Sequence, residues 1–323
     1  MMEPTHPFAV EVSALKKSYR SGPVLDGLAL EVARGSVFAL LGPNGAGKTT
    51  TVRILATLLD ADAGEVRVAG FDVRTQRGDV RRRISLTGQY AAVDALQTGE
   101  ENLWTIARLA GLPRPASRQL TAELLERFGL TEAASRRVGA YSGGMRRRLD
   151  LAASLVSAPE VIFLDEPTTG LDPSSRLELW KIVGELVDAG VTVFLTTQYL
   201  EEADRLADRI AVLDGGRIVA EGTADELKRV VAQERLELKL HRTAAFGELL
   251  ARLNGRVLDA NPVERTLSLA SDGGASDVRA LLDEIDPDRT TIEEFAVHKA
   301  TLDDVFLNLT GHTAQTGKET IRV

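Results

Sequence analysis

The sequence predicts an α/β fold in two parts: a largely parallel sheet with a helical subdomain, followed by a small α+β domain. Three observations support this prediction. Short apolar runs typical of fully buried strands, such as VFALL at 37–41 and VIFLD at 161–165, alternate with stretches of helical spacing. A glycine-rich turn, GPNGAGKT at 42–49, joins the first run to one of those helical stretches. Beyond residue 223, short segments alternate between apolar and polar residues.

The first part is expected to occupy residues 1–222. Residues 91–150 have mostly helical patterns, so we expect them to form a helical subdomain that interrupts the sheet. The sheet is expected to end in a hairpin, RIAVLDGGRIVAEG, because Asp214, Gly215 and Gly216 suit a tight turn. The predicted strands are 37–41, 161–165, 191–197 and 209–213.

The second part is expected at residues 223–323. Thr223 and Glu226 have the spacing of a capping box, which predicts that a helix begins at this boundary. The pattern of this part predicts a small α+β domain, for which a ferredoxin-like fold is one possible arrangement. Its segments are RLELKL and TLSLA, which alternate, AFGELLARL and DVRALLDEI, which are helical, TIEEFAVHK, which is extended, and TLDDVFLNLTG, a final helix.

Composition excludes several classes of protein. With 44% hydrophobic and 27% charged residues, the 323-residue chain has the composition of a globular protein. Its net charge of -8, with no basic domain, argues against a nucleic-acid partner. The absence of cysteine excludes disulfides and thiolate metal sites, and the four histidines have no metal-ligand spacing.

The sequence also predicts where the protein works. The amino terminus, MMEPTHPFAV, lacks the basic and long apolar regions of a signal peptide, so we expect the protein to stay in the cytoplasm. The apolar runs are far shorter than the roughly 20 residues that span a bilayer. Any membrane span is therefore expected from another chain.

Residues 42–49 match the phosphate-binding loop pattern G-x-x-x-x-G-K-[ST]. Glycines allow backbone N–H groups to surround phosphates, Lys48 can reach the β and γ phosphates, and Thr49 offers its hydroxyl to Mg²⁺. The flanking strand and helix make a chance glycine loop a poor explanation. The candidate binding residues are Gly42, Pro43, Asn44, Gly45, Ala46, Gly47, Lys48, Thr49 and Thr50.

Two carboxylates follow the buried run VIFLD. Asp165 is expected to hold magnesium through its hydration shell, and Glu166 to polarise the attacking water. An acidic pair after an apolar strand is often only a solvated strand end. The preceding phosphate loop favours the catalytic interpretation of Asp165, Glu166 and Lys48.

The segment YSGGMRRRLDLAASL at 141–155 contains a second predicted anion site. Ser142, Gly143 and Gly144 begin a helix, so a hydroxyl, free N–H groups and the helix dipole can face a phosphate. One chain cannot easily apply two such sites to one nucleotide. At this point residues 8 to about 222 resemble the ATP-binding cassette (ABC) family, in which the signature of one subunit covers ATP held by the phosphate loop of the other.

The resemblance implies roles for three further residues. Tyr19 is similar to the aromatic residue that stacks on adenine, although a single tyrosine is more often a core or surface residue. Gln89 in SLTGQYA is similar to the glutamine that contacts Mg²⁺ or water and senses the membrane partner, the alternative being a plain polar loop residue. Asp172 in TTGLDP resembles the aspartate that links the two sites of a dimer. The implied magnesium-site residues are thus Thr49, Gln89 and Asp165.

Gln198 departs from the family pattern. Most members have a histidine here, which contacts the γ-phosphate; glutamine keeps an N–H donor but cannot become positively charged. Because Glu166 is present, we expect an active ATPase with a slow turnover.

Three segments together resemble the daunorubicin-resistance ATP-binding subunits of bacterial drug exporters: TTQYLEEAD, YSGGMRRRLD and TLDDVFLNLTG. This resemblance implies a homodimer with two composite ATP sites at the cytoplasmic face of the cell membrane. It would drive efflux of a drug or lipid through a separate integral-membrane ABC permease, which the region after Gln89 would contact.

Two alternatives stay open. One is a soluble ABC ATPase that acts on ribosomes or DNA, although the chain has a single cassette and, between Lys48 and Asp165, no room for a long coiled coil. The other is a nucleotide-sensing regulatory module. The arginine runs Arg81–Arg83 and Arg146–Arg148 are interpreted as solvated faces rather than as phosphate or lipid contacts.

Overall fold

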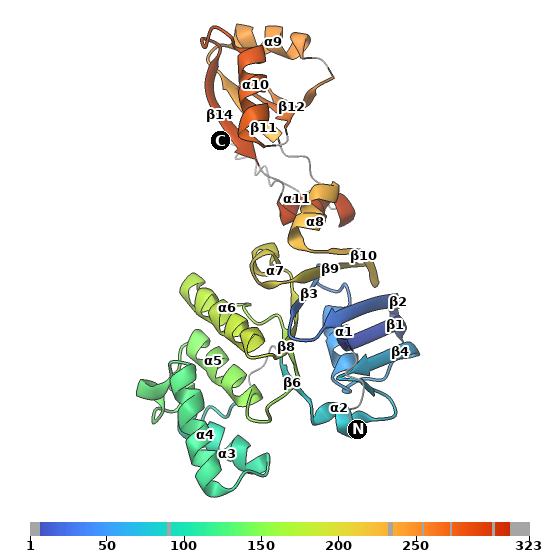
Figure 1. Cartoon of the computed structure of the whole chain (residues 1–323), viewed down its shortest axis with the longest axis vertical. Helices are drawn as coiled ribbons and strands as arrows, with labels where there is room; N and C mark the ends of the chain where they lie inside the picture. The colour runs from blue at the N-terminus through green and yellow to red at the C-terminus, as the bar shows by residue number, and fades with distance from the viewer. Residues whose placement is uncertain are drawn as a thin grey trace, which may run out of the picture. The chain divides into compact units, whose positions relative to one another are not determined.

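The computed structural model describes residues 7–88, 92–231, 235–253, 255–271, 273–298 and 301–310. The chain divides into two compact units, Met1–Ala224 and Asp225–Val323 (Figure 1). None of the helices in the described ranges has the length and apolar character needed to cross a membrane.

The first unit is built on a six-stranded sheet of order β10-β9-β3-β8-β7-β6. All pairings except β9 with β10 are parallel, which confirms the predicted fold class. Every residue of β3, β7 and β8 is buried, as expected for strands covered on both faces. The strands are β3 (Val37–Leu41), β6 (Ile84–Thr87), β7 (Val161–Asp165), β8 (Thr192–Thr197), β9 (Arg209–Asp214) and β10 (Arg217–Gly222).

The closing hairpin forms as predicted. Asp214 pairs with Arg217, so Gly215 and Gly216 alone form the turn, and both have positive φ, 53° and 79°. A two-residue turn with positive φ at both positions matches the twist of the strands that it joins and favours glycine.

A second, antiparallel sheet of order β2-β1-β4-β5 was not predicted from the sequence. Its long strands pair with register shifts, for example between Val12 and Leu15, so the alternation of buried and exposed residues is interrupted. The N–H of Asp26 donates to the carbonyl oxygen of Gly216 at 3.0 Å and joins this sheet to the hairpin. The strands are β1 (Phe8–Tyr19), β2 (Gly22–Ala33), β4 (Ala63–Val68) and β5 (Phe71–Asp72).

Helices surround the larger sheet and form the predicted helical subdomain. In Figure 1, α3, α4 and α5 lie together, away from α1 and the antiparallel sheet. Thr98 and Glu101 form a capping box at the start of α3. The helices are α1 (Lys48–Leu55), α2 (Arg77–Arg81), α3 (Gly99–Leu109), α4 (Arg114–Arg127), η1 (Thr131–Ala133), η2 (Val138–Ala140), α5 (Gly143–Ser154), α6 (Pro173–Asp188) and α7 (Leu200–Leu206).

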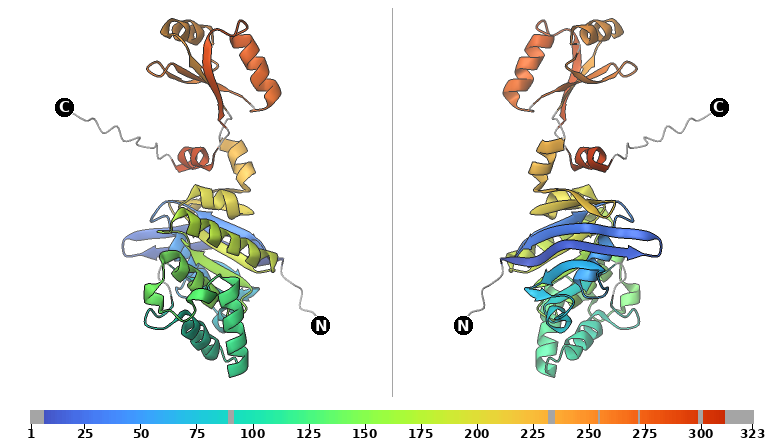
Figure 2. Two further views of the ribbon diagram at one scale, coloured as in Figure 1. Left: turned by 90° about the vertical axis from the view of Figure 1, so that its left-hand side faces the viewer. Right: turned by 90° about the vertical axis from the view of Figure 1, so that its right-hand side faces the viewer.

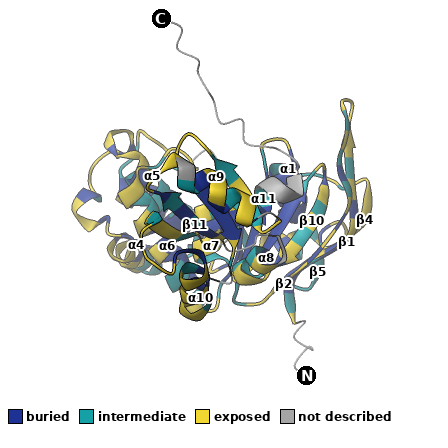
Figure 3. Cartoon of the chain, turned by 90° about the horizontal axis from the view of Figure 1, so that it is seen from above, coloured by how far each residue is buried: buried dark blue, intermediate teal, exposed yellow. Residues whose placement is uncertain are grey.

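The second unit contains the β-α-β-β-α-β order of a ferredoxin-like fold, with an antiparallel sheet of order β12-β13-β11-β14. This confirms the predicted α+β class, but the strand β12 was missed. Leu236, Leu238 and Leu240 of β11 are buried and pack with residues of α9 and α10. Figure 3 colours the chain by how far each residue is buried. The elements are α8 (Ala224–Val231), β11 (Arg235–Leu240), α9 (Thr243–Arg252), β12 (Val257–Asn261), β13 (Thr266–Ala270), α10 (Ala275–Ile285), β14 (Ile292–His298) and α11 (Leu302–Thr310). Both views of Figure 2 draw α8 and α11 side by side.

Asp286 organises the turn between α10 and β14. It is buried, and its carboxylate accepts backbone N–H bonds from Thr290, Thr291 and Ile292 at 2.9–3.0 Å. Burial raises the pKa of this carboxyl, but the three N–H donors outweigh that effect and hold the pKa below its ordinary value of 3.8.

Asp286→Ala is expected to reduce the free energy of unfolding of the second unit by about 2 kcal/mol, because three backbone donors lose an ionised acceptor. The lowered pKa stabilises the fold fully above the unfolded-state pKa of about 4, and this stabilisation is lost as pH falls through the folded-state value. The difference between variant and wild type should therefore be largest near pH 7 and narrow below about pH 4.

Chemical denaturation at several pH values measures this difference. Asp288→Ala, which removes an exposed carboxylate from the same turn, is the control. An equal loss of stability in both variants would contradict the role given to Asp286.

Candidate nucleotide-binding and hydrolysis site

The loop between β3 and α1 is shaped by close approaches that require glycine. A Cβ atom on Gly42 would lie 2.4 Å from the carbonyl oxygen of Leu213, and one on Gly47 would lie 2.7 Å from Cδ2 of Leu25. Gly47 also has a φ of 112°, which side chains rarely adopt. The loop therefore fits tightly between β9 and β2, and its backbone conformation is fixed by its neighbours.

Lys48 lies inside this loop, with its side chain 4% exposed. Its ammonium donates to the carbonyl oxygens of Gly42 and Pro43 at 2.8 and 3.1 Å. It also lies 3.4 Å from the carboxylate of Glu166. A phosphate bound in the loop would compete with these oxygens for Lys48, which would release Glu166 from its ion pair.

Asp165 ends the buried strand β7 and accepts two hydroxyl hydrogen bonds on Oδ1, from Thr49 at 3.2 Å and from Thr196 at 2.6 Å. Thr196, on the neighbouring strand β8, was not singled out from the sequence. Asp165 and Thr196 are partners in the parallel pairing of β7 with β8, which places the Thr196 hydroxyl beside the Asp165 carboxylate. A hydroxyl and a carboxylate oxygen are ligands of the kind that Mg²⁺ takes when phosphates supply others.

The backbone holds Glu166 in an unusual conformation. Its φ is 49°, a left-handed value that costs a residue other than glycine roughly 1–2 kcal/mol. Its N–H donates to the carbonyl and hydroxyl oxygens of Thr196 at 3.1 and 3.2 Å, which fixes this turn against β8. The chain therefore leaves the direction of β7 at Glu166, and the carboxylate of Glu166 lies against Lys48.

Ser142, Gly143 and Gly144 begin α5 as the sequence predicts. Ser142 is the N-cap and accepts the N–H of Met145 at 3.2 Å. A Cβ on Gly144 would lie 2.2 Å from the hydroxyl of Ser175, so α5 and α6 touch at their first turns. This contact makes the amino-terminal ends of the two helices neighbours.

Asp172 is the N-cap of α6. Its carboxylate accepts the backbone N–H of Ser175 at 3.0 Å. It also accepts the hydroxyls of Ser174 and Ser175, the second and third residues after Asp172. The hydroxyl of Ser174, followed by that of Ser175, holds the pKa of Asp172 far below its usual value. Asp172 is therefore a carboxylate at any physiological pH.

The structure gives fewer contacts for the remaining predicted site residues. Gln198 directly follows β8, whose last residue, Thr197, accepts the N–H of Gly42 at 3.3 Å. Tyr19 ends β1, is 44% exposed, and its ring centroid lies 5.8 Å from the ammonium of Lys17. Gln89 lies outside the described residues.

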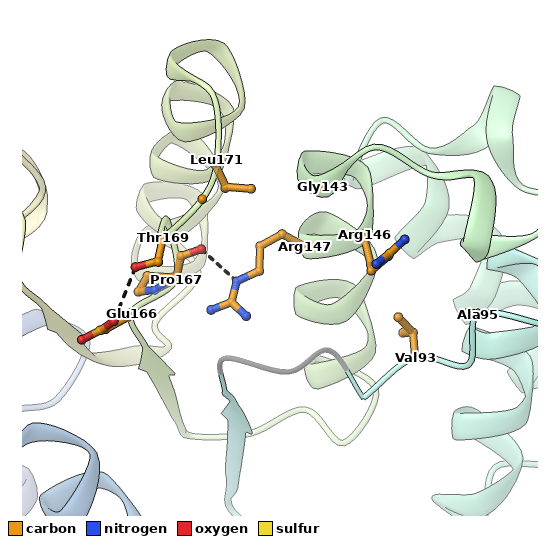
Figure 4. Close-up of a pocket in the computed structure, with 10 residues that line it drawn as sticks. Val93, Ala95, Gly143, Arg146, Arg147, Glu166, Pro167, Thr169 and Leu171 are labelled. Atoms are coloured by element: carbon orange, nitrogen blue, oxygen red, sulfur yellow. Dashed lines mark hydrogen bonds between the residues drawn. The ribbon is translucent and has the colours of Figure 1, made fainter.

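Arg147 is not the solvated residue that the sequence suggested. Its side chain is 10% exposed, because it extends from α5 toward the loop after β7 (Figure 4). Its Nε donates to the carbonyl oxygen of Pro167 at 2.9 Å and its Nη1 to that of Gly88 at 2.6 Å. Arg148 is also half-buried and donates to the carbonyl oxygen of Phe128 at 3.1 Å, so the interpretation as a solvated run was wrong for both.

A cleft of about 620 Å³ lies between α5 and the loop after β7. Figure 4 shows Glu166 and Thr169 on one side and Gly143 on the other. The two predicted phosphate-facing ends belong to different parts of the sheet: α5 packs on β6, and three strand spacings, about 14 Å, separate β6 from β3. The signature at the start of α5 and the phosphate loop after β3 are thus attached to different strands of the sheet.

Comparison with known proteins identifies the family of both units. Residues 25–169 match the family model for the ABC transporter, and residues 222–310 match that for the ATP-binding protein DrrA1-3-like C-terminal domain. A solved ATP-binding subunit of an ABC transporter superposes with a TM-score of 0.62 at 29% identity, covering 69% of this chain and 92% of the other.

Relatives match over nearly the whole chain. The daunorubicin/doxorubicin resistance ATP-binding protein DrrA of Streptomyces peucetius is 50% identical over 95% of this chain and 93% of its own length. The Nod factor export ATP-binding protein I of Paraburkholderia xenovorans is 37% identical over 95% of this chain and 98% of its own length. Since both family segments are present in one chain and half of its residues are identical to those of a DrrA protein, the chain belongs to the DrrA-like ATP-binding proteins of the ABC transporter family and is an ATPase.

Proposed function

We propose that this chain is the ATP-hydrolysing subunit of an exporter, acting as a homodimer on a separate integral-membrane permease at the cytoplasmic face of the membrane. The observation that supports the proposal most is the near full-length similarity to drug-resistance and export ATP-binding proteins, which includes the second unit. The transported compound is a drug, or a lipid of similar apolar character.

The residues that bind nucleotide are proposed from the geometry of the loop. Gly42, Pro43, Asn44, Gly45, Ala46, Gly47 and Thr50 surround the phosphates together with Lys48 and Thr49. Backbone N–H groups at the start of α1 and the ammonium of Lys48 complement their negative charge. Tyr19 is proposed to stack on the adenine ring.

The hydroxyl of Thr49 and the carboxylate of Asp165 fit Mg²⁺, because they are hard oxygen ligands 3.2 Å apart at the mouth of the loop. Gln89 is proposed to join them. When bound, Mg²⁺ neutralises charge that develops on the phosphate oxygens. No cluster of three or more carboxylate, histidine or cysteine ligands occurs in the described residues.

Glu166 is proposed to accept a proton from the attacking water, and Gln198 to donate a hydrogen bond to the γ-phosphate. Lys48 and Glu166 form an ion pair at 3.4 Å. Movement of Lys48 to the phosphates would free the carboxylate to orient water. Ser142, Gly143, Gly144 and Asp172 are proposed to complete the site of a partner subunit, as the resemblance to the ABC family implies.

Glu166→Gln is expected to lower kcat by about a hundredfold or more, since an amide cannot accept the proton, while ATP still binds. With ATP, this variant should accumulate as a dimer in light scattering. Glu178→Gln, which alters an exposed carboxylate on α6, should behave as wild type in turnover. Unchanged turnover would refute Glu166 as the base, and a Glu166→Gln protein that stays monomeric at high concentration would argue against composite sites.

Gln198→His is expected to increase kcat several-fold below about pH 6.5, where the imidazole is protonated and adds positive charge at the γ-phosphate. Wild type should lack this rise. Gln198→Ala should lower kcat, with little change in KM. Turnover measured between pH 6 and 8 tests this, and an alanine variant as active as wild type would show that Gln198 makes no useful contact.

Purification of the tagged protein from gently solubilised native membranes is expected to recover a stoichiometric multi-span partner. Cells with the wild-type chain should resist an exported drug, and cells with Lys48→Ala should not, because the ammonium that neutralises the phosphates is missing. Recovery from the soluble fraction bound to ribosomes, or resistance that survives Lys48→Ala, would favour the alternative, a soluble ABC ATPase or regulatory module.

A further inference from the structure

Arg147 contacts two backbone segments that are distant in sequence. Its guanidinium donates to the carbonyl oxygen of Pro167, directly after Glu166, and to that of Gly88, directly before Gln89. The two N–H groups that it uses, on Nε and Nη1, point in fixed directions because the guanidinium is planar. A single side chain of α5 therefore sets the separation between these two loops.

Asp150 lies one helical turn further along the same face of α5. It is 4% exposed, and its Oδ1 accepts the N–H of Ala92 at 2.7 Å. Its Oδ2 lies 3.7 Å from Nη1 of Arg147. Gly88 and Ala92, the described residues on either side of 89–91, are thus both bound by this one pair, which we call the α5 clamp (Arg147 and Asp150).

The charges around the clamp restrict how it can rearrange. Burial lowers the pKa of Arg147, whereas the carboxylates of Asp150, Glu202 and Asp165 raise it. Glu202 on α7 is completely buried and accepts the indole N–H of Trp180 at 3.2 Å. Removal of the cation would leave the buried carboxylates of Asp150 and Glu202 without this counter-charge.

The neighbouring Arg148 is a useful comparison, because its contacts only help to pack α5 against other helices. It donates to the carbonyl oxygen of Phe128 and lies 3.3 Å from the carboxylate of Glu178. Neither contact reaches the loop after β7 or the segment around Gln89. Arg147, by contrast, extends to both loops that border the hydrolysis site.

We propose that the α5 clamp is a positioning device for hydrolysis: Arg147 and Asp150 hold Gly88 and Ala92 against Pro167, and so fix Glu166 relative to the signature helix. The inference rests on the proposed role of Glu166. It assigns to α5 a function within its own chain, in addition to the one toward a partner subunit.

The test compares Arg147→Gln with Arg148→Gln, which removes the same charge and a similar carbonyl contact from the same helix. Arg147→Gln is expected to lower kcat about tenfold or more, with KM for ATP changed less than about threefold, because the phosphate loop is untouched. Amide exchange at Ala92 should accelerate. Arg148→Gln should lose thermal stability but keep kcat and slow exchange at Ala92.

Conservative variants distinguish positioning from simple destabilisation. Asp150→Asn keeps an oxygen acceptor for the N–H of Ala92 and should retain more activity than Asp150→Ala. If Arg147→Gln does not fold, Arg147→Lys serves instead: it keeps the charge, cannot reach both carbonyls with one planar group, and should also lower kcat.

Wild-type kcat at either Arg147 variant, or an equal loss of kcat in Arg148→Gln, would overturn the proposal. So would lowered kcat with unchanged exchange at Ala92. These results are distinct from failure of the proposed function, which would appear as wild-type protein without ATP turnover, or as Glu166→Gln with full turnover.

Discussion

The parallel pairing of three completely buried strands, β3, β8 and β7, is the constraint on which the rest of the first unit depends. Because they run in the same direction, their carboxyl ends meet at one edge of the sheet. The loops that follow them begin at Gly42, Gln198 and Glu166. Because these strands are buried along their whole length, packing on both faces of the sheet, and not a ligand, holds this edge.

The charged groups at this edge, Asp165, Glu166 and Lys48, are paired with partners within the protein. One oxygen of Asp165 receives hydroxyls from α1 and β8, while Lys48 satisfies its donors on loop carbonyls and on Glu166. The internal partners of Lys48 are those that a triphosphate would replace. Binding therefore exchanges one set of charge interactions for another and does not expose a bare charge, which limits the cost of entry to the site.

The sequence predicted those features that depend on local chemistry. The loop at 42–49, the strand before Asp165, the helix after Ser142 and the Gly215–Gly216 turn all have short-range signals and are present. The antiparallel sheet was missed because its bulged strands, such as Phe8–Tyr19, do not keep a period of two. Thr196 and Arg147 were missed for another reason: their partners are distant in sequence, and nothing in TT or RRR says which member will be buried.

The contact between Gly144 and Ser175 has a consequence for how two subunits would meet. With no space for even a methyl group there, α5 and α6 cannot slide past each other at their first turns. The Ser142 cap and the Asp172 cap must then travel as one rigid body. In the proposed dimer, a neighbouring protomer would therefore encounter both helix ends together.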